Sequence, residues 1–500
     1  MESISVKNYR SIAESGEIEI KPLTVILGKN SAGKSSFIRL FPLLKQTLER
    51  KISDTLLWYG DYVDFGDFQN TVSRDNPDKP IEIAFSMMTY NGFYGRYPRK
   101  NDKDGLQMKI ELSIKEKYIE KVGIRFFDQY ILLLMDNEGK TKVIINNDEK
   151  EYAKKNIVAV RETGNIIPIL LENGENINGQ NWLRRIDISD LLTYCKNYIY
   201  PEKEKKENVY TYPFYDELKI PICSQKEVLT YLKKINVTKF GNMKLEHKRF
   251  KNINNYIIAT KLLDIIDRIN TSISRDMKQT SYLKPIRAMV NRYYRVQGIS
   301  IDELDADGSN LPMILKNMTN KELLNFEQWS KEKFGVVFSV TSGEGHISLV
   351  IKNDVNGDIM TNVADTGYGY SQMLPIVMLL WMIHSKKNHY TFEKEKTIVI
   401  EQPELHLHPA YQAKMIDVFV NIIKEAEING IVIKIIFETH SEAMVNRIGT
   451  LISESKIDSN KINVLIFNKF KDKTEIESKQ FNESGLLVGW PIGFFAIDED

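Results

Sequence analysis

Acid, amide and histidine side chains follow two buried apolar runs in this sequence. Residues 397–400 read TIVI, a β-branched run typical of a central strand, and EQPELHLHP comes directly after it. Residues 433–437 read IKIIF, and ETHSE follows. In α/β enzymes the reactive groups gather at the carboxyl ends of such strands. The candidate catalytic residues are therefore Glu401, Gln402, Glu404 and His440, although a histidine in this position could also be an ordinary surface residue.

A glycine-rich stretch near the start of the chain matches a phosphate-binding loop. Residues 28–35 read GKNSAGKS, which fits G-x-x-x-x-G-K-[ST], with the apolar run PLTVIL before it and a helical pattern after it. Backbone N–H groups of such a loop surround phosphate oxygens, while the lysine adds positive charge and the serine hydroxyl can ligand Mg²⁺. The strand before and the helix after disfavour a chance Gly/Ser-rich turn. The predicted ligands are ATP and Mg²⁺, and the predicted nucleotide-binding residues are Gly28, Lys29, Asn30, Ser31, Ala32, Gly33, Lys34, Ser35 and Ser36, with Ser35 also a metal ligand.

A second glycine/serine stretch opens the most apolar helical segment. Residues 365–372 read DTGYGYSQ, and MLPIVMLLWMI follows at 373–383. Glycines and a serine at a helix N-terminus can form a second anion-binding nest, with a flexible helix cap as the alternative. The candidate residues are Gly367, Gly369, Ser371 and Gln372.

The order of these motifs resembles that of the ATP-binding-cassette ATPases. In that family the nest is the signature motif, the acidic strand is the Walker B segment, and the histidine is the switch residue. The resemblance implies that Glu401 holds Mg²⁺, directly or through water, and that His440 senses the γ-phosphate. It also implies that Gly369, Ser371 and Gln372 cap the γ-phosphate held by a second copy, in a head-to-head dimer with two ATP molecules between the chains.

The fold expected from this resemblance is α/β: an ABC-type P-loop ATPase head, with a mixed sheet and an antiparallel β subdomain. Lys34 and Ser371 are separated by 371 − 34 = 337 positions, so a large, partly helical insertion must interrupt the head. Period-two patterns over residues 81–172 predict an antiparallel meander, and helical spacing dominates from about 180 to 280. The predicted domains are residues 1–175 (N-terminal head with meander), 176–280 (mainly helical insertion), 281–470 (C-terminal head) and 471–500 (tail).

A closer resemblance rests on six stretches: NYRS, YLKPIR, GYGYSQMLPI, EQPELHLHPAYQA, ETHSE and GWPIGFF. Together they are similar to the bacterial ATPases related to the overcoming-lysogenization-defect (OLD) family. Within it they resemble the stand-alone ATPases of antiphage systems, such as PtuA of Septu, AriA of PARIS and retron-associated relatives. This resemblance implies an ATPase that senses DNA or phage and pairs with a separate nuclease, HNH-type as first choice and TOPRIM-type as second. It also implies assembly beyond the dimer.

A nuclease domain within the chain is not expected. One-chain members of the OLD group carry a TOPRIM domain after the ATPase, whereas only 500 − 440 = 60 residues follow His440, against roughly 100 for a full domain.

Two other classes of protein compete with the antiphage interpretation. A DNA-repair ATPase related to RecF and SMC proteins is the main alternative, but the SMC type would bring long heptad arms that the insertion lacks. A transporter subunit is disfavoured by the insertion itself.

Bulk properties are those of a folded cytoplasmic protein. The 500 residues suggest about two to four domains. The net charge of +1 gives no global field for nucleic acid or membrane, and the 373–383 run is shorter than the roughly 20 residues that span a bilayer. Cys195 and Cys223 have no metal-type spacing. Direct DNA binding remains open, because FYGRYPRK (93–100) mixes aromatic and basic residues, although a surface face is the more ordinary reading.

The histidines of ELHLHP also admit a metal reading. Glu404, His406 and His408 alternate, so they would share one face of a strand, but no further Cys or His nearby completes a zinc site. A loop at the dimer interface is the favoured interpretation of this segment.

The glutamine of EQPE sets an expectation about hydrolysis. A typical cassette strand ends in an Asp for Mg²⁺, followed by a Glu that polarises the attacking water, and then a Pro. Alignment on Pro403 places Glu401 at the metal position and Gln402 at the base position. Glutamine cannot accept a proton, so slow or negligible hydrolysis is expected. The alternative is that Glu404 acts as the base.

Overall fold

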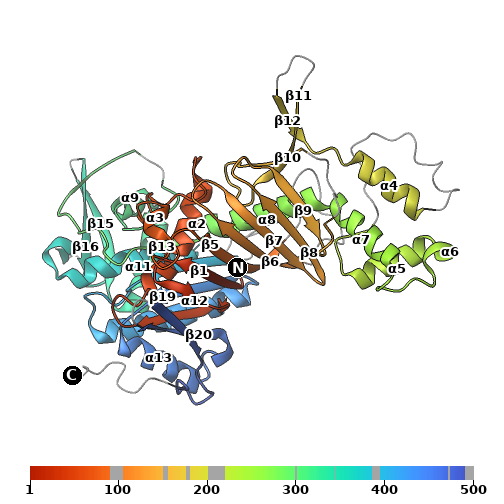
Figure 1. Ribbon diagram of the computed structural model, residues 1–500. Coiled ribbons are helices and arrows are strands. Elements are labelled where there is room, and N and C mark those ends of the chain that lie inside the picture. Colours follow the sequence, from red (N-terminus) through yellow and green to blue (C-terminus); the bar gives the residue numbers. More distant parts are fainter. Residues whose placement is uncertain are drawn as a thin grey trace. The chain divides into compact units, whose positions relative to one another are not determined.

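The computed structural model describes residues 1–89, 105–149, 156–175, 181–200, 220–298, 301–343, 345–357, 359–385, 395–470 and 473–489. Its ribbon is drawn in Figure 1. The chain divides into two compact units. The first comprises Met1–Tyr9, Thr47–Leu57 and Gly66–Arg275, and the second comprises Arg10–Gln46, Trp58–Phe65 and Asp276–Asp500.

The first unit is built on an antiparallel sheet in the order β1-β5-β6-β7-β8-β9. Buried and more exposed side chains alternate along β8, as expected for a sheet with one face on the core. The meander predicted from the period-two pattern is therefore present. The strands are β1 (Ser3–Tyr9), β5 (Ile81–Thr89), β6 (Leu106–Ile114), β7 (Ile119–Phe126), β8 (Gln129–Met135) and β9 (Thr141–Ile145), with a smaller sheet of β10 (Ile157–Val160), β11 (Ile169–Glu175) and β12 (Asn181–Arg185).

Helices make up much of the rest of this unit. They are α3 (Phe68–Thr71), α4 (Ser189–Ile199), α5 (Gln225–Ile235), α6 (Val237–Phe240), α7 (Lys248–Thr260) and α8 (Leu262–Lys278). Apolar side chains of α4 to α7 form their own core around Phe240 and Phe250. Buried amides join this helical part to the sheet, since Gln129 Nε2 donates to Asn254 Oδ1 at 3.1 Å. Figure 1 draws α8 against the sheet, and Arg268 donates to the carbonyl of Thr89 in β5.

The second unit contains a mostly parallel sheet in the order β13-β18-β19-β4-β20-β21. All six residues of β4 are buried, as expected for a strand with both faces covered. The strands are β4 (Leu23–Gly28), β13 (Ser281–Leu283), β18 (Glu395–Glu401), β19 (Val432–Glu438), β20 (Ile462–Phe470) and the antiparallel β21 (Lys473–Lys479). The unit also holds β2 (Ile12–Glu14), β3 (Ile18–Glu19) and a four-stranded antiparallel sheet of β14 (Tyr294–Arg295), β15 (Val337–Gly343), β16 (His346–Lys352) and β17 (Met360–Asn362).

Five helices of the second unit bury one continuous apolar core with this sheet: α9 (Leu311–Asn317), α10 (Asn320–Phe334), α11 (Tyr368–Ser385), α12 (Pro409–Ile428) and α13 (Glu442–Ser453). The unit also holds α1 (Lys34–Ile38), α2 (Leu40–Glu49, which continues into the first unit) and short 3₁₀ turns at Val363–Asp365 and Ser459–Lys461. Most of α11 is buried, which confirms the core helix predicted from its apolar run. In the described part of the chain, no helix is long and apolar enough to cross a membrane.

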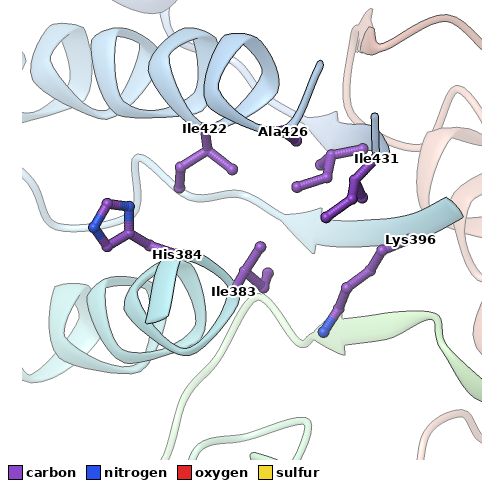
Figure 2. A pocket seen from close by; sticks show the side chains of 7 residues that line it. Ile383, His384, Lys396, Ile422, Ala426 and Ile431 are labelled. Atoms are coloured by element: carbon purple, nitrogen blue, oxygen red, sulfur yellow. The ribbon is translucent and has the colours of Figure 1, made fainter. Parts of the chain in front are cut away.

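A small apolar pocket lies within this core (Figure 2). Its lining comes from α11, α12 and the strands β18 and β19: Ile383, His384, Lys396, Ile422, Ala426, Ile431 and Ile433. It contains none of the predicted site residues. At its histidine, His384 Nδ1 lies 3.0 Å from Oε2 of Glu425.

Three parallel strands end at one edge of the second unit's sheet, and this edge carries the predicted chemistry. In the register of β18 and β19, Glu401 lies beside Glu438, and in that of β19 and β4, Glu438 lies beside Ile26. The acidic segment, the ETHSE segment and the phosphate loop are therefore neighbours. The predicted fold, an ABC-type P-loop ATPase head with a mixed sheet, antiparallel sheets and a partly helical insertion, is confirmed.

Candidate nucleotide-binding site

The glycine-rich loop connects β4 to α1 in a conformation that depends on two of its glycines. Gly28 has φ +152°, and a Cβ there would lie 2.4 Å from the carbonyl oxygen of Phe467 in β20. Gly33 (φ +94°) caps α1, and Ser31 also has a positive φ of 59°. Glycine at 28 is thus required by a close approach of two backbones as well as by its dihedral angle.

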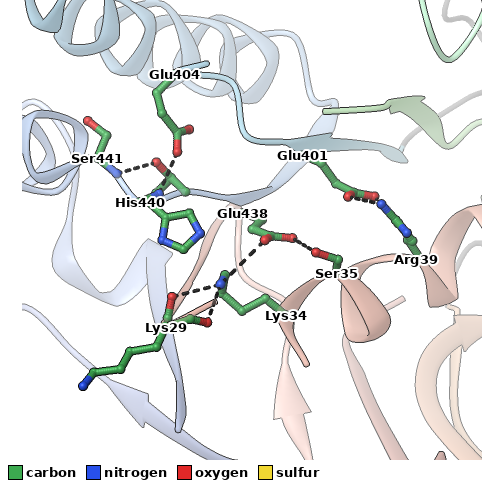
Figure 3. A network of polar contacts seen from close by, with 11 residues as sticks. Lys29, Lys34, Ser35, Arg39, Glu401, Glu404, Glu438, His440 and Ser441 are labelled. Carbon is green, nitrogen blue, oxygen red and sulfur yellow. Dashed lines mark hydrogen bonds and ion pairs between the residues drawn. The ribbon is translucent and has the colours of Figure 1, made fainter. Parts of the chain in front are cut away.

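Lys34 lies beneath this loop, almost completely buried. Its Nζ donates to the carbonyl oxygens of Gly28 at 2.9 Å and Lys29 at 2.8 Å, and it lies 3.8 Å from Glu438 Oε1. Figure 3 shows these contacts together with the neighbouring Ser35, whose hydroxyl donates to Glu438 Oε2 at 2.8 Å. Burial lowers the pKa of Lys34, while the charges of Glu438 and Glu404 oppose that shift. The carbonyl oxygens of Gly28 and Lys29 and the carboxylate of Glu438 therefore hold the Lys34 ammonium group at the loop.

Glu438 was missed by the sequence reasoning, which read ETHSE for its histidine alone. It is 2% exposed and contacts two side chains of the phosphate loop, Lys34 and Ser35. Burial and the neighbouring charge of Glu401 raise the pKa of Glu438 to about 7, although the hydrogen bond from Ser35 opposes the shift. An acid at the end of a buried strand was the available signal, and the adjacency of β19 to β4 was the missing information.

Glu401 is the last residue of β18, and its carboxylate is paired with an arginine. Arg39 Nε and Nη2 donate to the two carboxylate oxygens, each at 2.8 Å, and Tyr282 donates its hydroxyl to Oε1 at 2.5 Å. Burial opposes but does not outweigh these bonds, so the pKa of Arg39 is raised. Burial next to Glu401 raises the pKa of Tyr282. Arg39 and Tyr282 were also absent from the predicted site.

Gln402 begins a tight turn after β18. Its φ is +44°, and its N–H donates to the carbonyl oxygen of Glu438 at 2.9 Å, which joins the ends of β18 and β19. The turn continues through Glu404, His406 and His408 up to the start of α12. The three side chains therefore do not alternate along a strand, and the described residues contain no group of three or more His, Cys, Asp or Glu that could hold a metal ion.

Glu404 and His440 share an open pocket, which Gln412 and Ser441 also line. Glu404 Oε1 accepts the backbone N–H of His440 at 2.7 Å, as Figure 3 shows, and burial raises the pKa of the Glu404 carboxyl. Partial burial of the His440 ring and the charge of Lys34 both lower the pKa of His440. The neutral imidazole is therefore the favoured form beside the loop at pH 7.

The stretch predicted as a second nest lies at the start of α11, where its sequence placed a helix N-terminus. Gly367 and Tyr368 are exposed, and a Cβ on Gly367 would meet nothing within 4 Å. Ser371 and Gln372 are buried and bonded within the chain: the Ser371 hydroxyl donates to the carbonyl oxygen of Tyr368 at 2.7 Å, and the Gln372 amide pairs with the backbone of Arg287. The role of these residues toward a second copy's nucleotide stays a prediction.

These residues fit a nucleotide with Mg²⁺. The loop is shaped so that a single added Cβ at Gly28 would collide with the neighbouring strand, and Lys34, Ser35 and two carboxylates meet at its base. A lysine suits phosphate oxygens, and hydroxyl and carboxylate oxygens are the ligands that Mg²⁺ prefers. Lys34 and the loop N–H groups would hold the phosphates, and Ser35 with Glu438 or Glu401 would hold the metal. The fold and this site define a P-loop ATPase head.

The comparison with protein families agrees with that class. The model of the AAA ATPase domain family AAA_15 matches residues 1–445, so the chain belongs to this family of ATPases. A comparison with curated proteins gave no match.

Among solved structures, the chain is similar to SMC head domains. One is an SMC head bound to the C-winged helix domain of ScpA (10% identity, TM-score 0.35, covering 97% of this chain and 98% of that one). Another, from Pyrococcus furiosus, has an extended coiled coil and is bound to the C-terminal domain of ScpA (11%, 0.36, 95% and 95%). A third is the SMC head from Thermotoga maritima (9%, 0.34, 95% and 97%).

Two sequence features lie outside the described residues. FYGRYPRK (93–100) does so entirely, and of the terminal GWPIGFF only Gly489 is described.

Proposed function

We propose that this chain is the ATP-binding subunit of a bacterial antiphage complex, in which it controls a separate nuclease. Two copies would close head to head around two ATP molecules, and assembly would extend beyond the dimer. Hydrolysis would be slow or negligible, so that the closed state persists. The observation that carries the slow hydrolysis in this proposal is the position of Gln402, the residue directly after Glu401 at the sheet edge that meets the phosphate loop.

Gln402 supports slow hydrolysis by chemistry and by placement. A carboxamide can orient water through hydrogen bonds but cannot take its proton. The backbone of Gln402 is fixed by its bond to the carbonyl oxygen of Glu438, so the side chain starts from the edge of the site beside the loop. A general base contributes roughly 10²–10⁴-fold to a rate, so its absence leaves a slow enzyme. A slow enzyme remains bound to ATP for longer, which suits a regulator better than a motor.

The antiphage setting rests on the motifs that resemble the OLD-related ATPases. In that setting the nuclease partner is HNH-type as first choice and TOPRIM-type as second. Co-purification of the tagged chain with the product of the neighbouring gene, weighed by native mass spectrometry, tests this part. A nuclease in the complex supports the proposal. A recombination protein instead would overturn it in favour of a DNA-repair ATPase.

Hydrolysis itself is tested by phosphate release in a single turnover. Gln402→Glu restores a carboxylate of the same length and is expected to speed release by roughly 10²–10⁴-fold. Glu404→Ala is expected to leave the slow rate nearly unchanged. If Gln402→Glu has no effect and Glu404→Ala abolishes release, Glu404 is the base and the assignment of Gln402 is wrong.

A further inference from the structure

Arg287 lies between two parts of the site that are distant in the sequence. It is 1% exposed, and its Nη2 donates to the carbonyl oxygen of Glu401 at 3.0 Å. Its backbone N–H donates to Gln372 Oε1 at 3.1 Å, and Gln372 Nε2 donates back to the Arg287 carbonyl at 3.3 Å. The same residue thus contacts the first turns of α11 and the end of β18.

These bonds leave part of the Arg287 guanidinium without a hydrogen-bond partner. Among the described residues, its Nε and Nη1 are buried without a hydrogen-bond partner, and so is Oε2 of Glu404. Burial lowers the pKa of Arg287 to about 10, and the charges of Glu404 and Glu401 oppose that shift. A buried donor pair and a buried acceptor of opposite charge are complementary, because each is costly when it stays unpaired.

A buried cation with a purely structural role looks different in this chain. Lys45 is fully buried, and its Nζ donates to the carbonyl oxygen of Thr280 at 2.8 Å and to Glu303. Its ammonium group also lies over the ring of Tyr62. Arg287 instead has two groups, Nε and Nη1, without a hydrogen-bond partner among the described residues, while its Nη2 bonds the residue just before the turn that begins at Gln402.

We infer that Arg287 is a positioning residue that couples the first turns of α11 to the carboxylate of Glu404. A displacement of Gln372 moves the backbone of Arg287, and the guanidinium carries that displacement to the carbonyl of Glu401, where the turn that holds Glu404 begins. This inference rests on the proposed function, in which the start of α11 meets the partner copy's nucleotide while Glu404 and His440 lie at the chain's own. Arg287 then connects the two half-sites within one chain.

Hydrogen exchange in the isolated chain measures this coupling directly. The N–H of His440 reports on Glu404, because Glu404 Oε1 accepts it. Gln372→Ala and Arg287→Gln are each expected to speed exchange of the His440 N–H by about tenfold. The double variant is expected to exchange no faster than Arg287→Gln, since both changes break one chain of contacts. Arg287→Lys keeps a cation and is expected to restore part of the protection.

Lys45→Met is the matched control, because it removes a buried cation that lies outside the contacts of Glu404. It is expected to lower the melting temperature without a selective change at His440. The inference is overturned if Gln372→Ala leaves the His440 N–H unchanged, or if the effects of Gln372→Ala and Arg287→Gln multiply. It is also overturned if Arg287→Gln raises exchange over the whole unit, as Lys45→Met would.

The dimer is tested separately, by sedimentation of the wild-type chain with Mg²⁺ and ATPγS. Failure of the wild type to dimerise would overturn the proposed closure. The exchange experiment would still decide the coupling, because it needs neither nucleotide nor partner.

Discussion

Glu401 and Glu438 lie side by side on neighbouring strands, yet their carboxylates have different partners. Glu401 is held by Arg39 and Tyr282, whereas Glu438 contacts Ser35 and Lys34. We therefore expect Glu438→Gln to weaken the Mg²⁺-dependent part of nucleotide affinity by roughly 10–100-fold, the range seen when a supporting partner of a metal ligand is lost. Titration of ATPγS by calorimetry, with and without Mg²⁺, measures this change.

Glu401→Gln is the paired variant for that measurement. It leaves a neutral amide beside Arg39, so it is expected to lower the melting temperature while most of the Mg²⁺ dependence remains. If Glu401→Gln removes the dependence and Glu438→Gln keeps it, the metal position belongs to Glu401, as the alignment on Pro403 placed it.

The sequence could indicate Lys34 and Ser35 because their motif is local: eight consecutive residues between a buried strand and a helix. The sequence also indicated that Glu401, Gln402, Glu404 and His440 lie at or just beyond the ends of strands, since buried β-branched runs can be recognised in a sequence. Arg39 and Tyr282 could not be found in this way. They reach Glu401 across 362 and 119 positions, and only the strand order brings them together. The sequence could not predict the left-handed backbone of Gln402 either, because glutamine rarely adopts a positive φ.

Helix α1 and strand β18 are joined by the pair of Arg39 and Glu401. Arg39 is the C-cap of α1, and the carboxylate it binds is 1% exposed. Arg39→Ala would leave a buried carboxylate without its cation, so it is expected to lower the free energy of unfolding by about 3 kcal/mol. Urea denaturation of the two proteins measures the difference.

The Arg447–Asp417 pair offers a matched control, because it also joins an arginine to a carboxylate, here between α13 and α12. Its arginine and aspartate side chains are 27% and 33% exposed, so water can replace the arginine. Arg447→Ala is expected to cost about 1 kcal/mol or less. If Arg39→Ala and Arg447→Ala lower the free energy of unfolding equally, the burial of Glu401 does not determine how much the Arg39–Glu401 pair stabilises the protein.

The proposed head-to-head dimer can be tested at the scale of the whole molecule, because the phosphate loop and the candidate nest of α11 belong to different elements of the chain. If each nucleotide is shared between the loop of one copy and the nest of the other, every dimer has two composite sites. A chain defective in the loop and a chain defective in the nest then complement each other. Their mixed dimer keeps one site with an intact loop and an intact nest, and its other site carries both defects.

Lys34→Ala disables the loop, and Gly367→Glu places a negative charge in the nest. Gly367 is exposed with open space around it, so the substitution is expected to leave the fold intact. Each variant alone is expected to bind almost no ATPγS in the closed dimer. Random pairing of equal amounts makes half of the dimers mixed, each with one of two sites intact, so about a quarter of wild-type closed-site binding should return. Filter binding of radiolabelled ATPγS, after exchange of subunits, measures the recovery. Since sites built within a single chain cannot be rescued by mixing, binding equal to the average of the two pure variants would exclude a shared site.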